Sequence, residues 1–540
     1  MTSGRPAGPI PVTMPSYIQA ELTLPIDNAP NLYVLHVDGT ERIGEPYDFQ
    51  VTLCALTDTS IDVDSTIGEL ATLALKRVNT DGTLTEVRTI RGLVTDVEDS
   101  IEGSGVSRVY KVRIRPPVAL LDRISGQEIF VGAPIPEVIR GKLTHGALAL
   151  ALDIRLQDPA TYLDDATAAE WKDAPATGHP AEPRLVAQYK ESDLAFVMRL
   201  AEHVGLSMFF EEHEDGDRVV FTDNNGGFTQ ADATIPYRSG EATHGIVALS
   251  KKTQWIPTTV MTCDFNYRAP TQTLTDGDGQ VFDILGARED MPEPWPGLVV
   301  EYAPNVKNAR EAQHIAKVRA EELRTRSTRL VGQAELPTLA PGLRFKIGSH
   351  PSISEADEHV VFEARHIYDA PPPGSATDTR PPSYHLDFEA VPLKTGTAAF
   401  AVRPKVQTPK PKIHGLLTAV VVAPTSDGSA ERQHIDTVGR YLIKLHFAQG
   451  DVPTMPRVRM AQSHVGAGYG IHFPLRPGAE VLVAFLDGDP DRPVIVGAVS
   501  NAIHPSPVVS TSNADDPVEA NRILTRSGIL IEISDGDPPS

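Results

Sequence analysis

Residues 478–499, GAEVLVAFLDGDPDRPVIVGAV, carry the clearest structural signal in the C-terminal part of the chain. They contain two apolar runs on either side of Asp487-Gly488, a dipeptide that favours a turn with positive φ, and they therefore predict a β-hairpin. Arg440–Ala448 (RYLIKLHFA) and Pro456–Gln462 (PRVRMAQ) alternate as half-buried strands do. About five strands within about 90 residues fit a small closed barrel such as an OB-fold.

Three aspartates in this turn raise the question of a metal or catalytic site: Asp487, Asp489 and Asp491. Their spacing matches the start of a calcium-binding EF-hand loop, but that loop needs glycine and glutamate where this chain has Arg492 and Ala498. Glycoside hydrolysis needs an acid and a base that flank a cleft, which a tight turn does not offer. We therefore interpret the aspartates as structural: they accept backbone N–H bonds or pair with Arg492, while Pro490 and Pro493 fix φ.

The rest of the 540 residues also has a mainly β pattern, and this length predicts three or four domains at roughly 100–200 residues each. Residues Leu22–Pro117 alternate and contain turn signals, which indicates a barrel or sandwich. A proline-rich segment with basic residues, AVRPKVQTPKPKIHG, has the composition of a stiff, solvated interdomain linker.

Two segments have helical spacing instead, Glu191–Gly205 and Asn308–Ser327. Ser192 and Asn308 are placed to cap their N-termini, and Gly205 can end the first helix. Each helix carries a histidine that we expect to be a surface residue or a satisfied core residue, because no partner has metal-ligand spacing: His203 and His314.

Composition excludes several classes of function. The formal net charge of −22 repels phosphate backbones, so nucleic acid is not expected as a partner. The segment Lys412–Pro505 is neutral, with eight basic and eight acidic residues. Cys54 and Cys263 fit neither a disulfide framework nor a zinc site, and we expect free, buried thiols. The sequence contains no HExxH, Walker A or GxSxG motif, so no cofactor, metal or catalytic residue is predicted.

The ordered motifs from Gly439 onward resemble the OB-fold signature of VgrG-type spike proteins. The signature consists of a GR[VY] strand, a glycine-rich turn, and the sequences P-R-x-G-x-E-V and G-D-P-D-x-P. The residues that match this signature are Gly439, Arg440, Gly466, Gly468, Gly470, Gly478, Glu480, Gly488, Asp489, Pro490, Asp491, Arg492 and Pro493.

Two further stretches, Arg184–Asn224 and Ala340–Tyr368, are similar to the hub of the same family, which is related to the baseplate hub and spike of phage T4. The resemblance implies a mainly β, multi-domain protein with an α+β hub of phage-hub-like barrels and few helices. Its expected parts are a flexible arm (1–20), a hub with two barrel-like subdomains and helical insertions (21–395), a proline-rich linker (396–412), an OB-fold spike domain (413–505), and a neck with the start of a short trimeric β-needle (506–540).

The family implies a structural, non-enzymatic homotrimer at the tip of a contractile injection machine, either type VI secretion or a phage-tail-like extracellular particle. Expected partners are the hexameric inner-tube protein, baseplate proteins, a PAAR-like tip protein, effectors and, on firing, the target-cell membrane. The N-terminus is interrupted by prolines and lacks the apolar core of a signal peptide, so we expect assembly in the cytoplasm and delivery on contraction.

The last strands, NRILTRSGILIEI, cannot bury their apolar side chains alone, so we expect them to form a three-chain neck. The residues predicted for this contact are Leu524, Ile529, Leu530, Ile531 and Ile533. Two alternatives stay open: a phage-tail-associated enzyme that degrades cell walls, and an OB-fold nucleic-acid binder, which would need a basic groove and stacking aromatic residues.

Overall fold

The computed structural model describes residues 16–25, 32–55, 61–100, 108–144, 150–162, 184–213, 216–231, 234–238, 245–265, 267, 274–275, 281–282, 285–291, 296–307, 309–373, 380–395, 398–423, 435–436, 438–448, 455–508 and 520–534. The chain divides into two compact units. Unit 1 consists of Met1–Ser125, Pro134–Leu163 and Ser192–Pro409, and unit 2 of Gly126–Ala133, Asp164–Glu191 and Lys410–Ser540. Strands predominate in both, which confirms the mainly β fold with few helices.

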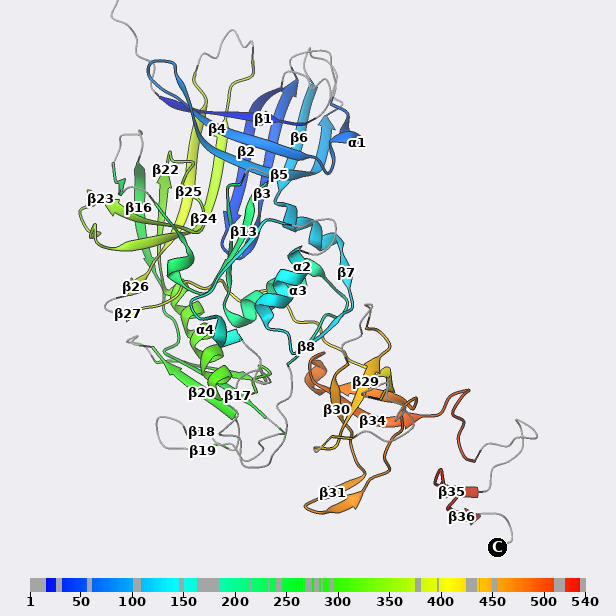
Figure 1. The fold of residues 1–540 in the computed structure, drawn as a ribbon. Helices are drawn as coiled ribbons and strands as arrows, with labels where there is room; N and C mark the ends of the chain where they lie inside the picture. The colour runs from blue at the N-terminus through cyan, green and yellow to red at the C-terminus, as the bar shows by residue number, and fades with distance from the viewer. Residues whose placement is uncertain are drawn as a thin grey trace, which may run out of the picture. The chain divides into compact units, whose positions relative to one another are not determined.

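A 13-stranded sheet forms most of unit 1 (Figure 1). Its strands alternate between buried and exposed residues, and their buried faces meet in one apolar core that includes Phe49, Tyr110 and Phe388. The main order is β1 (Tyr17–Thr23), β4 (Leu70–Val78), β5 (Leu84–Ser100), β6 (Arg108–Arg115), β3 (Glu45–Ala55), β2 (Leu32–Arg42), β24 (Glu358–Asp369), β25 (Ser383–Pro392), β22 (Thr328–Ala334) and β16 (Ile246–Thr253). From β24 the sheet branches through β23 (Leu343–Gly348) to β14 (Thr229–Gln230) and β15 (Ile235–Pro236).

The first strand, β1, begins inside the segment that was expected to be a flexible arm. Ile18, Ala20 and Leu22 bury their side chains in the core, and the strand pairs with β4 from Tyr17 onward. The ordered chain therefore starts earlier than residue 21, because the alternating apolar residues of YIQAELT fit one face of the sheet. Residues 1–15 of the predicted arm lie outside the described residues.

The pairing of β2 with β24 joins the N-terminal strands of the sheet to its later strands. A buried ionic cluster lies at this seam: Glu41 of β2 is 2.7 Å from Arg88 of β5 and 2.8 Å from His366 of β24. His366 in turn lies 2.8 Å from the Tyr384 hydroxyl on β25. Although burial opposes ionisation, Arg88 and His366 hold the pKa of Glu41 at about 2.

Smaller elements of unit 1 surround two helices that the sequence predicted. Ser192 caps α3 (Asp193–Val204) by accepting a bond from the Ala195 N–H at 3.1 Å, and Gly205 ends it with φ = 80°. The second helix is α4 (Ala309–Ser327); its predicted cap, Asn308, lies outside the described residues. Further elements of unit 1 are α1 (Val63–Thr66), α2 (Ile135–Thr144), β9 (Leu152–Arg155), β12 (Ser207–Glu211), β13 (Arg218–Thr222), β17 (Thr259–Asp264), β18 (Leu274–Thr275), β19 (Val281–Phe282), β20 (Leu285–Asp290), β21 (Leu298–Tyr302), β26 (Lys394–Thr395) and β27 (Ala398–Ala399).

A five-stranded barrel forms the core of unit 2. Its order is β30 (Arg457–Arg459), β29 (Arg440–Leu445), β28 (Leu417–Val421), β33 (Glu480–Phe485) and β34 (Pro493–Val499). Met460 bridges to Ile495, and the Ala461 N–H donates to the Ile495 carbonyl at 2.8 Å, so that the two edge strands are joined and the sheet closes. Unit 2 also contains two hairpins that form their own two-stranded sheets: β31 (His464–Gly466) with β32 (Tyr469–Ile471), and β35 (Ala520–Leu524) with β36 (Leu530–Ser534).

Unit 2 also contains residues from the region that the sequence assigned to the hub. β8 (Ile129–Val131) pairs with β10 (Leu185–Ala187), and Ile129, Ala187 and Tyr189 pack in the apolar core of the barrel. The Tyr189 ring meets the Phe447 ring edge to face at 5.3 Å between centroids. The predicted limits of the OB-fold domain, 413–505, left out these segments. They join the barrel through contacts between residues that are far apart in the sequence, and a local pattern does not reveal such contacts.

Candidate functional site

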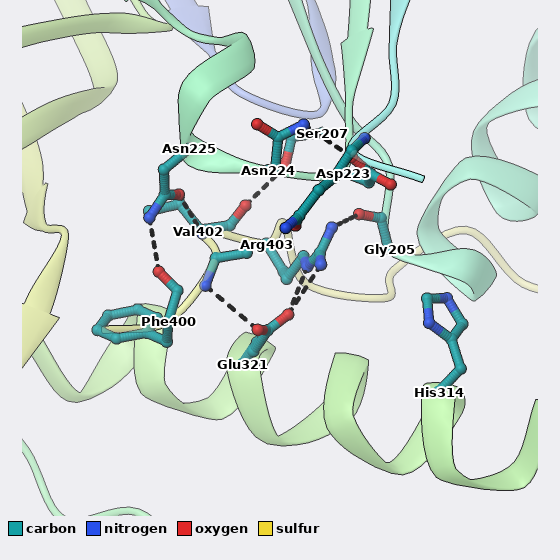
Figure 2. Close-up of polar contacts among 12 residues, drawn as sticks. Gly205, Ser207, Asp223, Asn224, Asn225, His314, Glu321, Phe400, Val402 and Arg403 are labelled. Carbon is teal, nitrogen blue, oxygen red and sulfur yellow. Dashed lines mark hydrogen bonds and ion pairs between the residues drawn. The ribbon is translucent and has the colours of Figure 1, made fainter. Parts of the chain in front are cut away.

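The segment Phe400–Thr408, which we call the strap, lies within unit 1 beside α4 (Figure 2). Its sequence predicted a solvated linker, but residues 402–404 are buried, whereas residues 405–407 are exposed. Phe400, Val402 and Arg403 are buried, at 4%, 2% and 5% exposure. Burial is tolerated because side chains of unit 1 satisfy the polar groups of the strap, as buried backbone and charge require.

Arg403 makes the strongest contacts of the strap. Its guanidinium donates to Glu321 of α4, with both Nε and Nη2 2.8 Å from Oε2, and it also donates to the carbonyl oxygen of Gly205 (Figure 2). The backbone N–H of Arg403 donates to the Thr325 hydroxyl at 3.0 Å. A buried cation is thus paired with a carboxylate and hydrogen-bonded in addition, which is the arrangement that offsets desolvation.

Side chains also replace strand partners along the backbone of the strap. The Asn225 side chain donates to the Phe400 carbonyl at 2.7 Å and accepts from the Val402 N–H at 3.0 Å. The Ser207 hydroxyl donates to the Val402 carbonyl at 2.8 Å. These bonds satisfy the backbone of the strap, to which the structure assigns no strand.

The end of the strap is held by α3. Glu202 of α3 accepts bonds from the backbone N–H groups of Gln407 and Thr408, at 2.9 and 2.8 Å, and from the Thr408 hydroxyl at 2.7 Å. The two helices predicted from the sequence therefore each supply one buried carboxylate to the strap.

The two helix histidines are satisfied, as predicted. His314 Nε2 lies 3.2 Å from the Val204 carbonyl oxygen, and burial lowers the pKa of this histidine. His203 Nδ1 lies 3.4 Å from a guanidinium nitrogen of Arg319. Within the described part of the chain, no group of three or more His, Cys, Asp or Glu residues is placed to hold a metal ion. Cys54 and Cys263 are free and buried.

In unit 2, the acidic turn is built around Lys410. The Lys410 Nζ is 2.6 Å from Asp489 and 2.7 Å from Asp491, and Asp491 also accepts from the Ala187 N–H at 2.7 Å. Burial lowers the pKa of Lys410, but Asp491 and Asp489 outweigh it, and the net pKa is raised. Burial and the Asp491 charge raise the pKa of Asp489. The sequence offered Arg492 as the cation for these aspartates, and gave no signal for Lys410.

The turn itself needs left-handed backbone at two positions. Asp487 has φ = 54° and Gly488 has φ = 73°, between β33 and β34. The Gly488 carbonyl accepts from the Ile413 N–H at 2.8 Å, and the Leu486 N–H donates to the Arg492 carbonyl at 3.0 Å. The turn thus fixes the chain that enters the barrel as well as the hairpin.

Gly488→Val is expected to destabilise unit 2. A left-handed φ costs an L-residue roughly 1–2 kcal/mol, and the new Cβ would lie 3.3 Å from Lys412 Cβ. Thermal unfolding of the full chain measures the effect as a lowered transition for unit 2. The matched control is Gly497→Val in β34, where φ is not positive and nothing lies within 4 Å of the added Cβ. Equal transitions for the two variants would contradict the argument.

The other residues of the predicted set lie at separate turns and strand ends of the barrel and do not form one site. Gly439 has φ = 82° and precedes Arg440, which is buried and 2.6 Å from Asp436. Gly478 has φ = 90°, and Glu480 accepts from the Asn501 side chain at 2.9 Å. Gly466, Gly468 and Gly470 lie in the β31–β32 hairpin.

The β35–β36 hairpin exposes apolar side chains on both of its faces. Ile523 pairs with Ile531 and Leu524 with Leu530, and Arg522 forms an ion pair with Glu532. The residues predicted for the neck are each between 50% and 65% exposed: Leu524, Ile529, Leu530, Ile531 and Ile533. Such a hairpin has no core of its own.

Residues 40–371, more than half of the chain, match the model of the phage tail baseplate hub (GPD). The chain belongs to the phage tail baseplate hub family. Residues 433–499 match a second model, the OB domain of type VI secretion system and phage-baseplate injectors, and this match includes β29, β30, β33 and β34 of the barrel.

Curated relatives agree with the hub family. The chain is 27% identical over 518 residues to the type VI secretion system spike protein VgrG4b of Pseudomonas aeruginosa, and 25% identical over 536 residues to VgrG1b of the same organism. These alignments cover 92% and 94% of this chain but only 58% and 62% of the relatives. The actin cross-linking toxin VgrG1 of Vibrio cholerae is 29% identical over 335 residues, which are 59% of this chain and 28% of the toxin.

Solved structures show the same fold at low identity. The E. coli c3393 protein, described as a type VI secretion component similar to the T4 tail proteins gp27 and gp5, superposes with a TM-score of 0.58 at 19% identity, covering 89% of this chain and 100% of that one. The lidded Francisella PdpA-VgrG complex gives a TM-score of 0.61 at 9% identity, with 98% and 77% coverage. Among the described residues, no helix is long and apolar enough to cross a membrane.

Proposed function

We propose that this hub-family chain is the trimeric hub and spike of a contractile injection machine, where it joins the inner tube to the membrane-puncturing tip and helps deliver effectors. The observation that carries the trimer is the β35–β36 hairpin. Ile523, Ile531 and Ile533 lie on one face and Leu524 and Leu530 on the other, by strand alternation, and none is buried.

Association of three copies would cover both faces. Burying one large aliphatic side chain contributes about 1.5–3 kcal/mol, so the neck residues of each copy together can stabilise a trimer considerably. Closed cyclic symmetry lets every copy bury the same residues, whereas an isolated hairpin of this length is marginally stable at best.

The proposed partners follow from the same role: the hexameric inner-tube protein, baseplate proteins, a PAAR-like tip protein, effectors, and the target membrane on firing. We propose assembly in the cytoplasm of a cell that carries a type VI system or a related phage-tail-like particle, followed by delivery on contraction. The chain itself is proposed to be non-enzymatic, since the machine performs the work. The cell-wall-degrading alternative has no observation in its favour, and a muralytic assay tests it.

Light scattering of the purified full chain tests the trimer. The expected mass is three times 58.3 kDa. The double variant Ile531→Asp/Ile533→Asp places charges in the neck contact and is expected to give a monomer, because a desolvated unpaired carboxylate is strongly unfavourable. Leu84→Asp, at a side chain 60% exposed in unit 1, is the control and should remain trimeric. A stable wild-type monomer would overturn the proposal.

A further inference from the structure

Asn225 holds the strap through its side-chain amide, and it is followed by Gly226 in the only Asn-Gly dipeptide of the 540-residue sequence. We propose that Asn225 is a deamidation site that the closed strap protects, so that the chain modifies itself when the strap opens. The inference concerns residues of unit 1 and does not depend on the proposed trimer.

Deamidation is a reaction between an asparagine side chain and the peptide nitrogen of the next residue. The Gly226 nitrogen loses its proton and forms a bond to the side-chain carbonyl carbon of Asn225, the bond from this carbon to Nδ2 breaks, and ammonia leaves. Water then opens the five-membered succinimide ring and gives aspartate or isoaspartate. Glycine hinders this ring closure least, because it has no Cβ and its backbone is conformationally free.

The peptide nitrogen that reacts is accessible and lies next to a positive charge. Gly226 is exposed to solvent, so hydroxide can reach its N–H. Arg344 Nη1 donates to the backbone carbonyl oxygen of Asn225 at 3.0 Å. This oxygen belongs to the peptide that must lose a proton, and a nearby cation stabilises the anion that forms. The surroundings of the Asn225–Gly226 peptide therefore favour the reaction.

The side-chain amide is restrained, because the strap binds both of its polar atoms (Figure 2). Asn225 Nδ2 donates to the Phe400 carbonyl at 2.7 Å, and Oδ1 accepts from the Val402 N–H at 3.0 Å. Phe400 and Val402 are both buried. Ring closure expels the nitrogen that binds the Phe400 carbonyl and turns the amide carbon toward Gly226. It would leave buried polar groups of the strap without partners, which is unfavourable.

The turn that carries Asn225 adds a second restraint. η4 (Asn225–Gly227) is a single 3-10 turn whose preceding residue, Asn224, caps it. The Gly227 N–H donates to the backbone carbonyl of Asn224 at 3.2 Å and to its side-chain oxygen at 3.1 Å. A succinimide ring fixes the ψ angle of its asparagine outside the helical range, so η4 must loosen as the ring forms. The folded, closed state therefore slows the reaction in two ways.

The product cannot hold the strap as the amide does. A carboxylate at position 225 has no N–H to donate to the Phe400 carbonyl, and its negative charge would face the lone pairs of that oxygen. Isoaspartate in addition inserts one carbon into the backbone of η4. A reversible opening of the strap thereby becomes a lasting one, and residue 225 marks the chains in which it has occurred.

Mass spectrometry of peptides from the full chain tests the inference. The protein is incubated in mildly alkaline buffer and digested, and residue 225 is scored as asparagine, aspartate or isoaspartate. The folded wild type is expected to deamidate at least about tenfold more slowly at Asn225 than the chain in guanidinium chloride, because the restraints exist only in the folded state. Gly226→Ala is the control for the chemistry and should slow the reaction in denaturant, since its Cβ hinders ring closure.

Two arginine variants separate opening of the strap from unfolding of unit 1. Arg403→Met removes the contacts of the strap with Glu321 and Gly205, and should speed deamidation of the folded chain by about tenfold or more. Arg88→Met is the matched control: it removes an equally buried cation from its ion pair with Glu41, away from the strap. This variant should deamidate at the wild-type rate under conditions in which circular dichroism shows both variants to be folded.

Other outcomes overturn the inference. Equal rates in the folded and the unfolded wild type would show that the strap does not protect Asn225. Acceleration by Arg88→Met as large as that by Arg403→Met would assign the reaction to unfolding of unit 1 as a whole. If neither variant accelerated it, opening of the strap would not control the reaction.

Trypsin tests the consequence of the modification. Lys405 is an exposed residue of the strap, and cleavage after it requires the strap to leave its buried position. Asn225→Asp imitates one product of deamidation and is expected to be cut there about tenfold faster than the wild type. Asn79→Asp makes the same change in the turn between β4 and β5 and should be cut at the wild-type rate. Equal cleavage of the two variants would contradict the role of the amide in holding the strap.

Discussion

Arg403→Met is expected to lower the free energy of unfolding of unit 1 by about 3–5 kcal/mol. The Arg403 and Glu321 side chains are 6% and 8% exposed, so removal of the cation leaves a buried carboxylate without the charge that compensates its desolvation. The methionine retains apolar volume, which limits the effect of lost packing. Denaturant unfolding of the full chain measures the change through the midpoint of the unit 1 transition.

Two further variants isolate the role of charge. Arg365→Met removes a cation from an ion pair with Asp38 in which the side chains are 53% and 38% exposed, and this control should unfold much as the wild type does. Arg403→Met/Glu321→Gln removes both buried charges and should recover part of the lost stability. If the double variant loses as much stability as the two single substitutions do in sum, the desolvated carboxylate is not the cause of the instability of Arg403→Met.

Ionisation of Asp217 is expected to make unit 1 less stable as the pH rises toward neutrality, compared with a chain in which residue 217 cannot ionise. Burial raises the pKa of Asp217 to about 7, and Glu41 and Glu212 add to the shift while Tyr47 and Arg88 oppose it. A group whose folded pKa is raised binds its proton more tightly in the folded chain. Its stabilising effect is complete below a pH of about 3.8 and is lost as the pH rises through about 7.

Asp217→Asn tests this dependence between pH 5 and pH 8. The asparagine cannot ionise. The free energy of unfolding of the variant, relative to that of the wild type, should therefore rise by about 3 kcal/mol from pH 5 to pH 8, at 1.36 kcal/mol for each pH unit below the folded pKa. Urea unfolding at the two pH values gives the difference. The range avoids the titration of Glu41, whose lowered pKa of about 2 affects stability only in stronger acid.

Glu98→Gln is the control for the pH experiment, since the Glu98 side chain is 59% exposed on the same sheet. It should follow the wild type at both pH values. If the free energy of unfolding of Asp217→Asn also changed with pH as that of the wild type does, the buried carboxyl would not titrate in this range.

Local signals explain what the sequence predicted well. Ser192 and Gly205 mark the limits of α3 because caps act within one turn of the chain, and Asp487-Gly488 marks the β33–β34 turn because positive φ is a property of the residues themselves. The prediction of the neck residues, which remains a prediction, also rests on a local signal, because an apolar run in a short hairpin cannot be buried within its own length.

Long-range contacts explain what the sequence did not predict. Prolines and basic residues in the strap have the composition of solvated chain, but Arg403 meets Glu321 from 82 residues away and Lys410 meets Asp491 from 81 residues away. Nothing in the local pattern distinguishes a buried, paired arginine from a solvated one. The same holds for β8 and β10, whose short apolar runs do not reveal which core they join.

The packing of the β8 and β10 segments in the core of the barrel determines how the protein can be divided for experiments. A fragment cut at residues 413–505 would lack Ile129, Ala187 and Tyr189, and would present the apolar surface they cover to water. It would also lack Lys410, leaving Asp489 and Asp491 beside each other without their shared cation. Poor solubility of such a fragment would result from the choice of its limits. A recombinant OB-fold domain of this chain should therefore include the two upstream segments of unit 2.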